Sequence, residues 1–149
     1  MTAFALRQAT VDDLDDLLPR TAALNAHEGI EVSRDALRAA LAHLLGDASL
    51  GGVWLVEDLV NEIVGYAIVT YGYDLEFAGR DAWLTELWID ESARARGAGA
   101  EALAQLPDVL RSAGVHALHL QVRPDNPAHR LYARAGFTTS PRVIMTRRL

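Results

Sequence analysis

The stretch DAWLTELWIDESARARGAGAEAL, residues 81–103, decides the fold. Its first ten residues are rich in apolar and aromatic side chains, which is typical of a β-strand. A turn that contains Gly97 and Gly99 follows, and the alanines and leucines after it predict a helix that begins near residue 97 and ends before Gly114. The stretch therefore predicts a strand, a glycine turn and a helix in immediate succession.

The segments on both sides continue this alternation of strand and helix patterns. Strands are expected at residues 3–8, 52–58, 63–73, 81–90, 116–122 and 142–149, and helices at residues 11–26, 34–46, 97–113 and 127–135. Pro107 lies inside the third helix and should kink it or end it early. No repeat, low-complexity tract or linker divides the chain. We therefore expect one α/β (α+β) domain, residues 1–149.

Composition limits both the chemistry and the location of the protein. The chain has no cysteine, which excludes disulfides, thiolate metal sites and a cysteine nucleophile. Its five histidines are not spaced to share a metal ion, so no metal is expected. No segment reaches the ~18 consecutive apolar residues of a membrane span, and the N-terminus does not resemble a secretory signal. These features favour a cytoplasmic protein with no membrane partner.

The charges are divided unevenly along the chain. Residues 1–91 hold 5 arginines and 17 acids (net −12), whereas residues 92–149 hold 9 arginines and 3 acids (net +6). A basic C-terminal part suits an anionic ligand, and an acidic N-terminal part suits a cationic one. The acids at residues 12–16 also fit a solvated helix start, where acids are favourable in any case. The total charge of −6 and the lack of an aromatic–basic stripe argue against a nucleic-acid partner.

The glycine turn has the features of a phosphate-binding site. Glycines allow backbone N–H groups to approach an anion, and the first turn of a helix has unpaired N–H donors at the positive end of the helix dipole. Arg94 and Arg96 add positive charge. The other interpretation is a flexible turn that binds nothing. A P-loop and a dinucleotide fingerprint do not fit, because no Lys-Ser/Thr follows and only two glycines occur.

Two motifs resemble those of the GNAT superfamily of N-acetyltransferases. Arg94-x-x-Gly97-x-Gly99-Ala100 is similar to the motif Q/R-x-x-G-x-G/A, and DNPAHRLYARAGF, residues 125–137, is similar to the Asn, Ala and LY…GF signature. The resemblance implies acetyl-CoA as cofactor, CoA as product, and a homodimer. It also implies the GNAT fold, a mixed, mostly antiparallel sheet of about six to seven strands flanked by about four helices.

The resemblance also assigns cofactor-binding roles. The backbone amides of the turn would hold the pyrophosphate, from residues Arg94, Ala95, Arg96, Gly97, Ala98, Gly99 and Ala100. The backbone of Leu87, Trp88 and Ile89 would pair with the pantetheine arm as if it were an added strand. An asparagine of the second motif would contact the cofactor, and its spacing leaves Asp125 and Asn126 as the two candidates for that position.

Acetyl transfer to an amine needs a base for the amine proton and an acid for the departing thiolate. The resemblance implies Tyr132 as the acid, and the alternative is an aromatic ring that only packs against the sheet. Glu86 is the candidate base. Strict alternation places it on one face with Leu84 and Trp88, where apolar surroundings would raise the pKa of its carboxyl group. The alternative is an acid at the sheet edge that pairs with an arginine such as Arg80. Because there is no cysteine, transfer should be direct.

The acceptor is a primary amine of unknown identity. Glu76 and Asp81 lie close to Glu86 in the sequence, and this acidic segment resembles that of diamine and polyamine acetyltransferases. His27 and Glu28, where the first helix ends, could also reach the acceptor. The hypothesis is a small molecule with more than one positive charge, such as a polyamine. The alternatives are a solvated hairpin loop, a protein or peptide amine as acceptor, and a sensor that binds acetyl-CoA without catalysis.

Overall fold

The computed structural model describes residues 2–149 as a five-stranded sheet flanked by helices. The strands lie side by side in chain order: β1 (Phe4–Gln8), β2 (Gly51–Asp58), β3 (Ile63–Asp74), β4 (Gly79–Ile89) and β5 (Ala117–Leu120). Pairing is antiparallel from β1 to β4 and parallel between β4 and β5. The sheet is therefore mixed and mostly antiparallel, as the resemblance implied.

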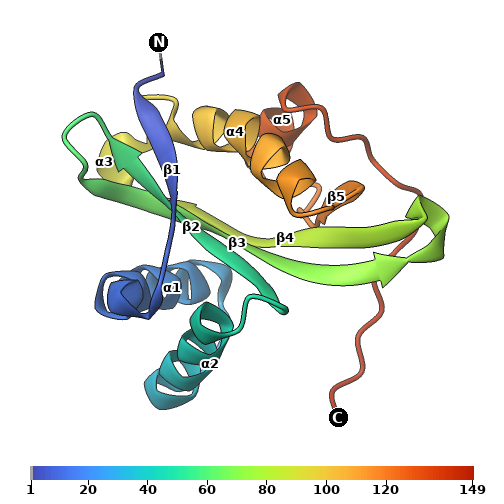
Figure 1. Ribbon diagram of the computed structural model, residues 1–149, viewed down its shortest axis with the longest axis horizontal. Coiled ribbons are helices and arrows are strands. Elements are labelled where there is room, and N and C mark those ends of the chain that lie inside the picture. Colours follow the sequence, from blue (N-terminus) through green and yellow to red (C-terminus); the bar gives the residue numbers. More distant parts are fainter. Residues whose placement is uncertain (1) are drawn as a thin grey trace.

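Helices cover both faces of this sheet (Figure 1). Five α-helices are present in the described residues: α1 (Leu14–Glu28), α2 (Arg34–Gly46), α3 (Glu91–Arg94), α4 (Ala98–Ser112) and α5 (Ala128–Arg134). The first two lie on one face, and α4 lies on the other with α5 beside it. There are also two short 3-10 helices: η1 (Val11–Asp13) precedes α1, and η2 (Leu75–Phe77) joins β3 to β4. None of these helices is long and apolar enough to cross a lipid bilayer.

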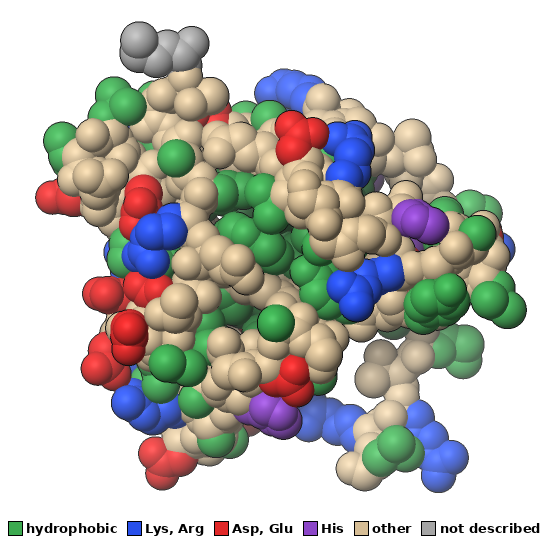
Figure 2. Space-filling model, viewed as in Figure 1, with side chains coloured by type: hydrophobic (Ala, Val, Ile, Leu, Met, Phe, Trp, Pro, Cys, Tyr) green, Lys and Arg blue, Asp and Glu red, His purple; other side chains and the backbone are tan. Residues whose placement is uncertain are grey.

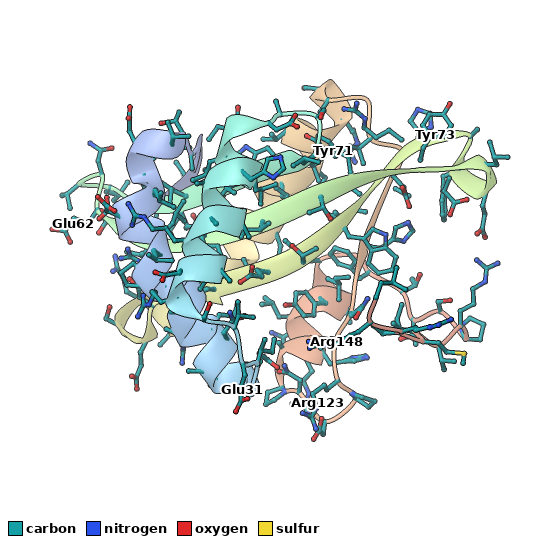
Figure 3. The ribbon with its side chains drawn as sticks, turned by 90° about the horizontal axis from the view of Figure 1, so that it is seen from below. Glu31, Glu62, Tyr71, Tyr73, Arg123 and Arg148 are labelled. Atoms are coloured by element: carbon teal, nitrogen blue, oxygen red, sulfur yellow. The ribbon has the colours of Figure 1, made fainter. Side chains whose placement is uncertain are left out.

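Apolar clusters lie on both faces of the sheet. On one face, Leu17 of α1 and Leu41 of α2 pack against Tyr66 of β3. On the other face, Leu106 of α4 packs against Leu84 of β4 and its neighbours. The first six residues of β2 are all buried, which explains why its sequence is continuously apolar rather than alternating. The end of the β3–β4 hairpin extends beyond α1 and α2 (Figure 3).

Local sequence signals set several helix ends. The hydroxyl of Thr10 accepts a hydrogen bond from Asp12 N, and the Asp13 carboxylate accepts one from Thr10 N at 2.8 Å. Ser33 Oγ accepts from Ala36 N at 3.2 Å, which caps α2 where the sequence predicts it. Pro107 does not end α4, which continues to its expected end. A proline inside a helix costs about 3 kcal/mol, and the buried leucines of α4 offset this cost.

Two of the expectations about the elements are wrong. Residues 142–149 form no strand, so the described sheet has five strands rather than six to seven. The segment contains the apolar run Val143, Ile144 and Met145, but a strand also requires a neighbouring strand, and this segment pairs with none. The structure has five α-helices rather than four, because residues Glu91–Arg94 form an additional short helix between β4 and the glycine turn.

Candidate active site

A β-bulge in β4 sets the geometry of the site. Glu86 lies opposite Ile68, but Leu84 lies opposite the next residue of β3, so Thr85 is an extra residue. Its hydroxyl donates a hydrogen bond to Ile68 O at 3.3 Å. Because of the extra residue, the side chains that follow it point to the opposite faces of the sheet from those that strict alternation predicts. The expectation that Glu86 shares a face with Leu84 is therefore wrong: Leu84 faces α4, whereas Glu86 and Trp88 face α1.

Tyr66 holds the carboxyl group of Glu86. Tyr66 is fully buried, and its hydroxyl donates a hydrogen bond to Glu86 Oε1 at 2.9 Å. Burial raises the pKa of Glu86 above that of an ordinary glutamate, and the hydrogen bond from Tyr66 lowers it in part. Burial and the charge of Glu86 raise the pKa of Tyr66, so its hydroxyl keeps its proton. Arg80, the alternative partner of Glu86, instead donates to Ala113 O and stacks on Tyr71.

The backbone of β4 is open on one side beyond Leu84. β5 pairs with β4 only from Asp81 to Leu84. Residues 85–89 therefore have β3 on one side and no strand of the described chain on the other. Free N–H and C=O groups of this kind can bind an extended ligand as an added strand. At the end of this stretch, Ile89 O accepts a hydrogen bond from Arg94 Nε at 2.8 Å, which ties the following turn to the strand.

The glycine turn presents the N-terminus of α4. Gly97 has a φ of +83° and immediately precedes the first residue of the helix, with no side chain to cap it. A Cβ atom added at Gly97 would meet nothing within 4 Å, whereas one at Gly99 would lie 3.5 Å from Leu131 of α5 and 3.7 Å from Ile89. The first amides of α4 have no side-chain acceptor among residues 2–149. The turn therefore fits an anion such as a pyrophosphate.

Two arginines flank the turn. The Arg94 guanidinium stacks over the Trp88 ring at 4.8 Å, and that of Arg96 stacks over the Phe4 ring at 5.2 Å. Both side chains are exposed, as are Ala95 and Ala100, while Ala98 is buried beneath the turn. The structure thus places both arginines and the glycine turn between the end of β4 and the start of α4.

Tyr132 lies on α5, near the N-terminus of α4. Its ring is partly buried against the cluster on the α4 face and meets Phe137 edge-on, with 6.0 Å between the ring centroids. Burial raises the pKa of Tyr132, and the negative charge of Glu28 raises it further. The phenol is therefore protonated near neutral pH and is able to donate a proton.

The C-terminal end of α1 reaches the same region. The ring of His27, an exposed residue, meets the Trp88 ring edge-on with 6.4 Å between centroids. Arg20 anchors the helix, because it donates to both carboxylate oxygens of Asp90 at 2.8 to 3.2 Å and to Ile63 O at 2.9 Å. Asp90 also accepts from Trp88 Nε1 at 3.0 Å. These contacts hold His27 and Glu28 beside β4.

The remaining predicted site residues have partners within the chain. Asn126 Oδ1 accepts a hydrogen bond from Ala128 N, the first residue of α5, at 2.9 Å, which leaves the amide N–H groups of Asn126 for a ligand. Asp125 Oδ1 lies 3.6 Å from Arg123 Nε, and both residues are exposed. Arg123 is labelled in Figure 3. Asn126 and Asp125 both lie in the loop that leads into α5, and no hydrogen bond or ion pair among the described residues joins either of them to the turn before α4.

Glu76 and Asp81 lie at the other end of the β3–β4 hairpin. Glu76 pairs with Arg142 at 2.7 Å, and the buried Asp81 lies 3.2 Å from His119 Nε2. Asp81 is five residues from Glu86 along β4, a distance of about 16 Å. The structure therefore does not gather these carboxylates around Glu86. Within residues 2–149, no group of three or more His, Asp or Glu side chains is arranged to hold a metal ion.

Four residues of the site were not identified from the sequence. Tyr66 and Thr85 shape the position of Glu86, and Arg20 and Asp90 fix α1 to β4. The charged pair joins residues 70 positions apart, and Tyr66 is 20 positions from Glu86. No local pattern marks such contacts. The only signal was chemical: a tyrosine and an arginine within apolar segments need polar partners.

Known proteins resemble this chain in sequence and in structure. The model of the "Acetyltransferase (GNAT) family" matches residues 14–137. An integron cassette protein from the mobile metagenome of Cole Harbour Salt Marsh is 29% identical with a TM-score of 0.85, and the match covers 97% of this chain and 90% of that chain. No curated protein matches the sequence significantly.

Two further solved structures share the fold at lower identity. A predicted acetyltransferase from Clostridium acetobutylicum, solved with acetyl-CoA, is 18% identical with a TM-score of 0.78 over 97% of this chain and 96% of that chain. An aminoglycoside acetyltransferase from an uncultured soil metagenomic sample, solved with trehalose, is 16% identical with a TM-score of 0.75 over 99% and 96% of the two chains.

Tyr66→Phe should raise the pKa of Glu86. The substitution removes the hydrogen bond that stabilises the charged carboxylate and leaves its burial unchanged. The protonated form of Glu86 therefore becomes more favourable relative to the charged form. NMR titration of isotope-labelled glutamate side chains measures the pKa, and Glu86→Gln identifies the signal. Tyr73→Phe, at an exposed tyrosine of the same strand, is the control and should change nothing. An equal or lower pKa in Tyr66→Phe would contradict the assigned contact.

Proposed function

The chain belongs to the acetyltransferase (GNAT) family, and we propose that it transfers an acetyl group from acetyl-CoA directly to a primary amine of a small, positively charged molecule. One observation carries the proposal. The open backbone of β4 at residues 85–89 leads directly into the uncapped N-terminus of α4. An extended arm and a pyrophosphate would thus be bound by consecutive parts of one surface.

The glycine turn and β4 would bind different parts of acetyl-CoA. The amides from Gly97 to Ala100 would hold the pyrophosphate, with Arg94 and Arg96 supplying charge at the rim. The backbone of residues 87–89 would pair with the pantetheine arm. The acetyl-CoA present with the structurally similar protein of Clostridium acetobutylicum supports this assignment. When bound, acetyl-CoA supplies the acetyl group as a thioester.

Glu86 would act as the base. An amine must lose a proton before it can attack, and a base works best when its pKa lies near the working pH. Burial moves the pKa of Glu86 in that direction. Tyr66 keeps the carboxyl group in one orientation through Oε1, so that Oε2 remains available to the acceptor amine or to a water molecule that relays its proton.

Tyr132 would act as the acid. Its pKa is raised by burial and by Glu28, so the phenol enters the reaction protonated and donates its proton to the departing sulfur. Without a cysteine in the chain, attack of the amine in a ternary complex is the direct route. Asn126 retains free amide N–H groups and would contact the cofactor from the loop before α5.

The acceptor would enter beside the end of α1. His27 and Glu28 are exposed there, and Glu31 follows in the α1–α2 connection (Figure 3). Carboxylates at this entrance favour a cationic acceptor. A second amine of a polyamine or an amino sugar would reach Glu76 or Asp81 only by replacing Arg142 or His119. The likeness to an aminoglycoside acetyltransferase supports a small acceptor with several amines.

An acceptor panel tests the proposed function. The panel contains a polyamine, an aminoglycoside, a free amino acid and a peptide with a free N-terminus, and release of the CoA thiol is followed with a thiol-reactive dye. The protein has no cysteine, so its own thiols add no background. We expect turnover with a small molecule that carries several amines. Acetyl-CoA binding without turnover on any acceptor would overturn the proposal and favour a sensor, and turnover of the peptide alone would overturn the small-molecule acceptor.

Gly97→Ala should weaken CoA binding by about tenfold, equivalent to the loss of one charge-assisted hydrogen bond of roughly 1.5 kcal/mol. The added methyl group would stand at the amides that hold the pyrophosphate. Gly114→Ala is a matched control, because Gly114 also has a positive φ (+79°) and open space around its Cβ but lies beyond the other end of α4. Calorimetry should find weaker binding only for Gly97→Ala, although both variants lose stability. Equal affinities would place the cofactor elsewhere.

Tyr132→Phe should lower kcat by roughly 10²-fold or more and change the KM for acetyl-CoA little, because the hydroxyl acts on charge that develops during the reaction. Steady-state kinetics with the best acceptor of the panel measures both constants. Tyr73→Phe is again the control, since that hydroxyl is exposed on the distal part of β3. An unchanged kcat would remove Tyr132 from the role of acid.

A further inference from the structure

Arg94 is bound to one of the backbone groups that the proposed cofactor would need. Asp90 N donates to Val64 O at 2.7 Å, so the N–H of Asp90 points toward β3. Successive residues of an antiparallel strand point their N–H and C=O groups in opposite directions, and those of Leu87 and Ile89 therefore point to the open side of β4. Arg94 Nε donates to Ile89 O at 2.8 Å. In the free protein, this carbonyl is thus already in use.

A second contact holds the Arg94 side chain in the same place. Its guanidinium lies over the Trp88 ring, 4.8 Å from the ring centroid. The ring is itself fixed, because Trp88 Nε1 donates to Asp90 Oδ1 at 3.0 Å and Asp90 is bound by Arg20. Arg94 remains exposed, and a guanidinium stacked on an indole at an exposed site is held only weakly. The two contacts therefore position Arg94 without locking it.

An anion at the glycine turn would be a stronger partner for the same guanidinium. Arg94 lies four residues before Ala98, the first residue of α4. An arginine and a phosphate are both charged and can form two parallel hydrogen bonds, whereas Ile89 O is neutral and accepts one from Arg94. Figure 2 shows the arginines on the face in view spread apart rather than gathered in one basic patch. An anion at the turn therefore depends on the arginines beside it, Arg94 and Arg96.

We propose that Arg94 is a displaceable occupant of the cofactor site. In the free protein it covers Ile89 O, and when acetyl-CoA binds, its guanidinium moves to the pyrophosphate. The vacated carbonyl then accepts an amide N–H of the pantetheine arm, which pairs with β4 as an added strand. Each group exchanges one partner for another, so none is left unpaired. This inference rests on the proposed function, and it makes Arg94 a positioning residue rather than a catalytic one.

The exchange makes the two ends of the cofactor cooperate. A pantetheine arm without a pyrophosphate must compete with Arg94 for Ile89 O, whereas the complete cofactor supplies Arg94 with its new partner. A ligand shifts such an equilibrium only by its different affinities for the two states, and here the pyrophosphate provides that difference. The site would therefore select a thioester that is carried on a diphosphate over the same thioester on bare pantetheine.

Removal of the Arg94 side chain tests the exchange, because the two ends of the cofactor should respond in opposite directions. Arg94→Ala should bind pyrophosphate more weakly, and it should bind pantetheine about fivefold more tightly, equivalent to one hydrogen bond of roughly 1 kcal/mol. NMR titration of the backbone amides of β4 and the turn with each probe measures both dissociation constants. Arg96→Ala is the comparison. Because Arg96 stacks on Phe4 instead, this variant should also bind pyrophosphate more weakly but should bind pantetheine as the wild type does.

Tryptophan fluorescence follows the movement of Arg94 directly. Pyrophosphate alone should change the emission of the wild-type protein, because the guanidinium leaves the Trp88 ring. Arg94→Ala should show no such change, and Trp88→Phe identifies the signal among the three tryptophans. A wild-type emission that does not respond to saturating pyrophosphate would overturn the exchange.

The pantetheine titration separates this inference from the proposed function. An unchanged or lower affinity of Arg94→Ala for pantetheine would overturn the exchange, because Arg94 would then not compete for Ile89 O. The proposed function would survive that result if calorimetry still found CoA bound to the wild-type protein. Failure of the wild type and of both variants to bind CoA would overturn the proposed function and the exchange together.

Discussion

The bulge at Thr85 is the constraint on which the rest of the site depends. A single extra residue in β4 turns Glu86 toward α1 and places it within hydrogen-bond reach of Tyr66. The bulge lies directly after Leu84, the last residue that pairs with β5. β4 and β5 therefore separate at the point where the side chains of β4 change faces. The position of the proposed base and the open backbone that would bind the cofactor thus meet at one local irregularity of β4.

Burial raises the pKa of both proposed catalytic groups, and the consequences for the two groups are opposite. A raised pKa brings Glu86 closer to neutrality, where a carboxylate is an effective base. A raised pKa moves Tyr132 away from neutrality, which keeps the phenol as an acid. Placing a carboxylate among apolar residues costs free energy, and the hydrogen bond from Tyr66 offsets part of this cost. The site therefore needs apolar surroundings and also one well-placed donor.

Features with strong local signals could be predicted from the sequence, whereas those that depend on register could not. Ser33 caps a helix whose bounds, residues 34–46, match the expectation, because a helix end is determined by its neighbours. The glycine turn before α4 could be predicted from its own residues in the same way. The reversal at Thr85 follows from how β4 pairs with β3, and alternation alone gave the opposite face for Glu86. The strand expected at residues 142–149 is absent, because a strand also needs a neighbouring strand, which the residues of one segment do not reveal.

The separation of β4 from β5 links the proposed chemistry to the length of the edge strand. A sheet that stayed paired along its whole length would leave no free backbone on β4 for a ligand, and it would extend β5 beyond four residues. Keeping β4 open therefore requires a short β5, and a short edge strand with partly buried leucines covers its own cluster poorly. The free backbone of β4 that would bind the cofactor therefore depends on the shortness of the edge strand beside it.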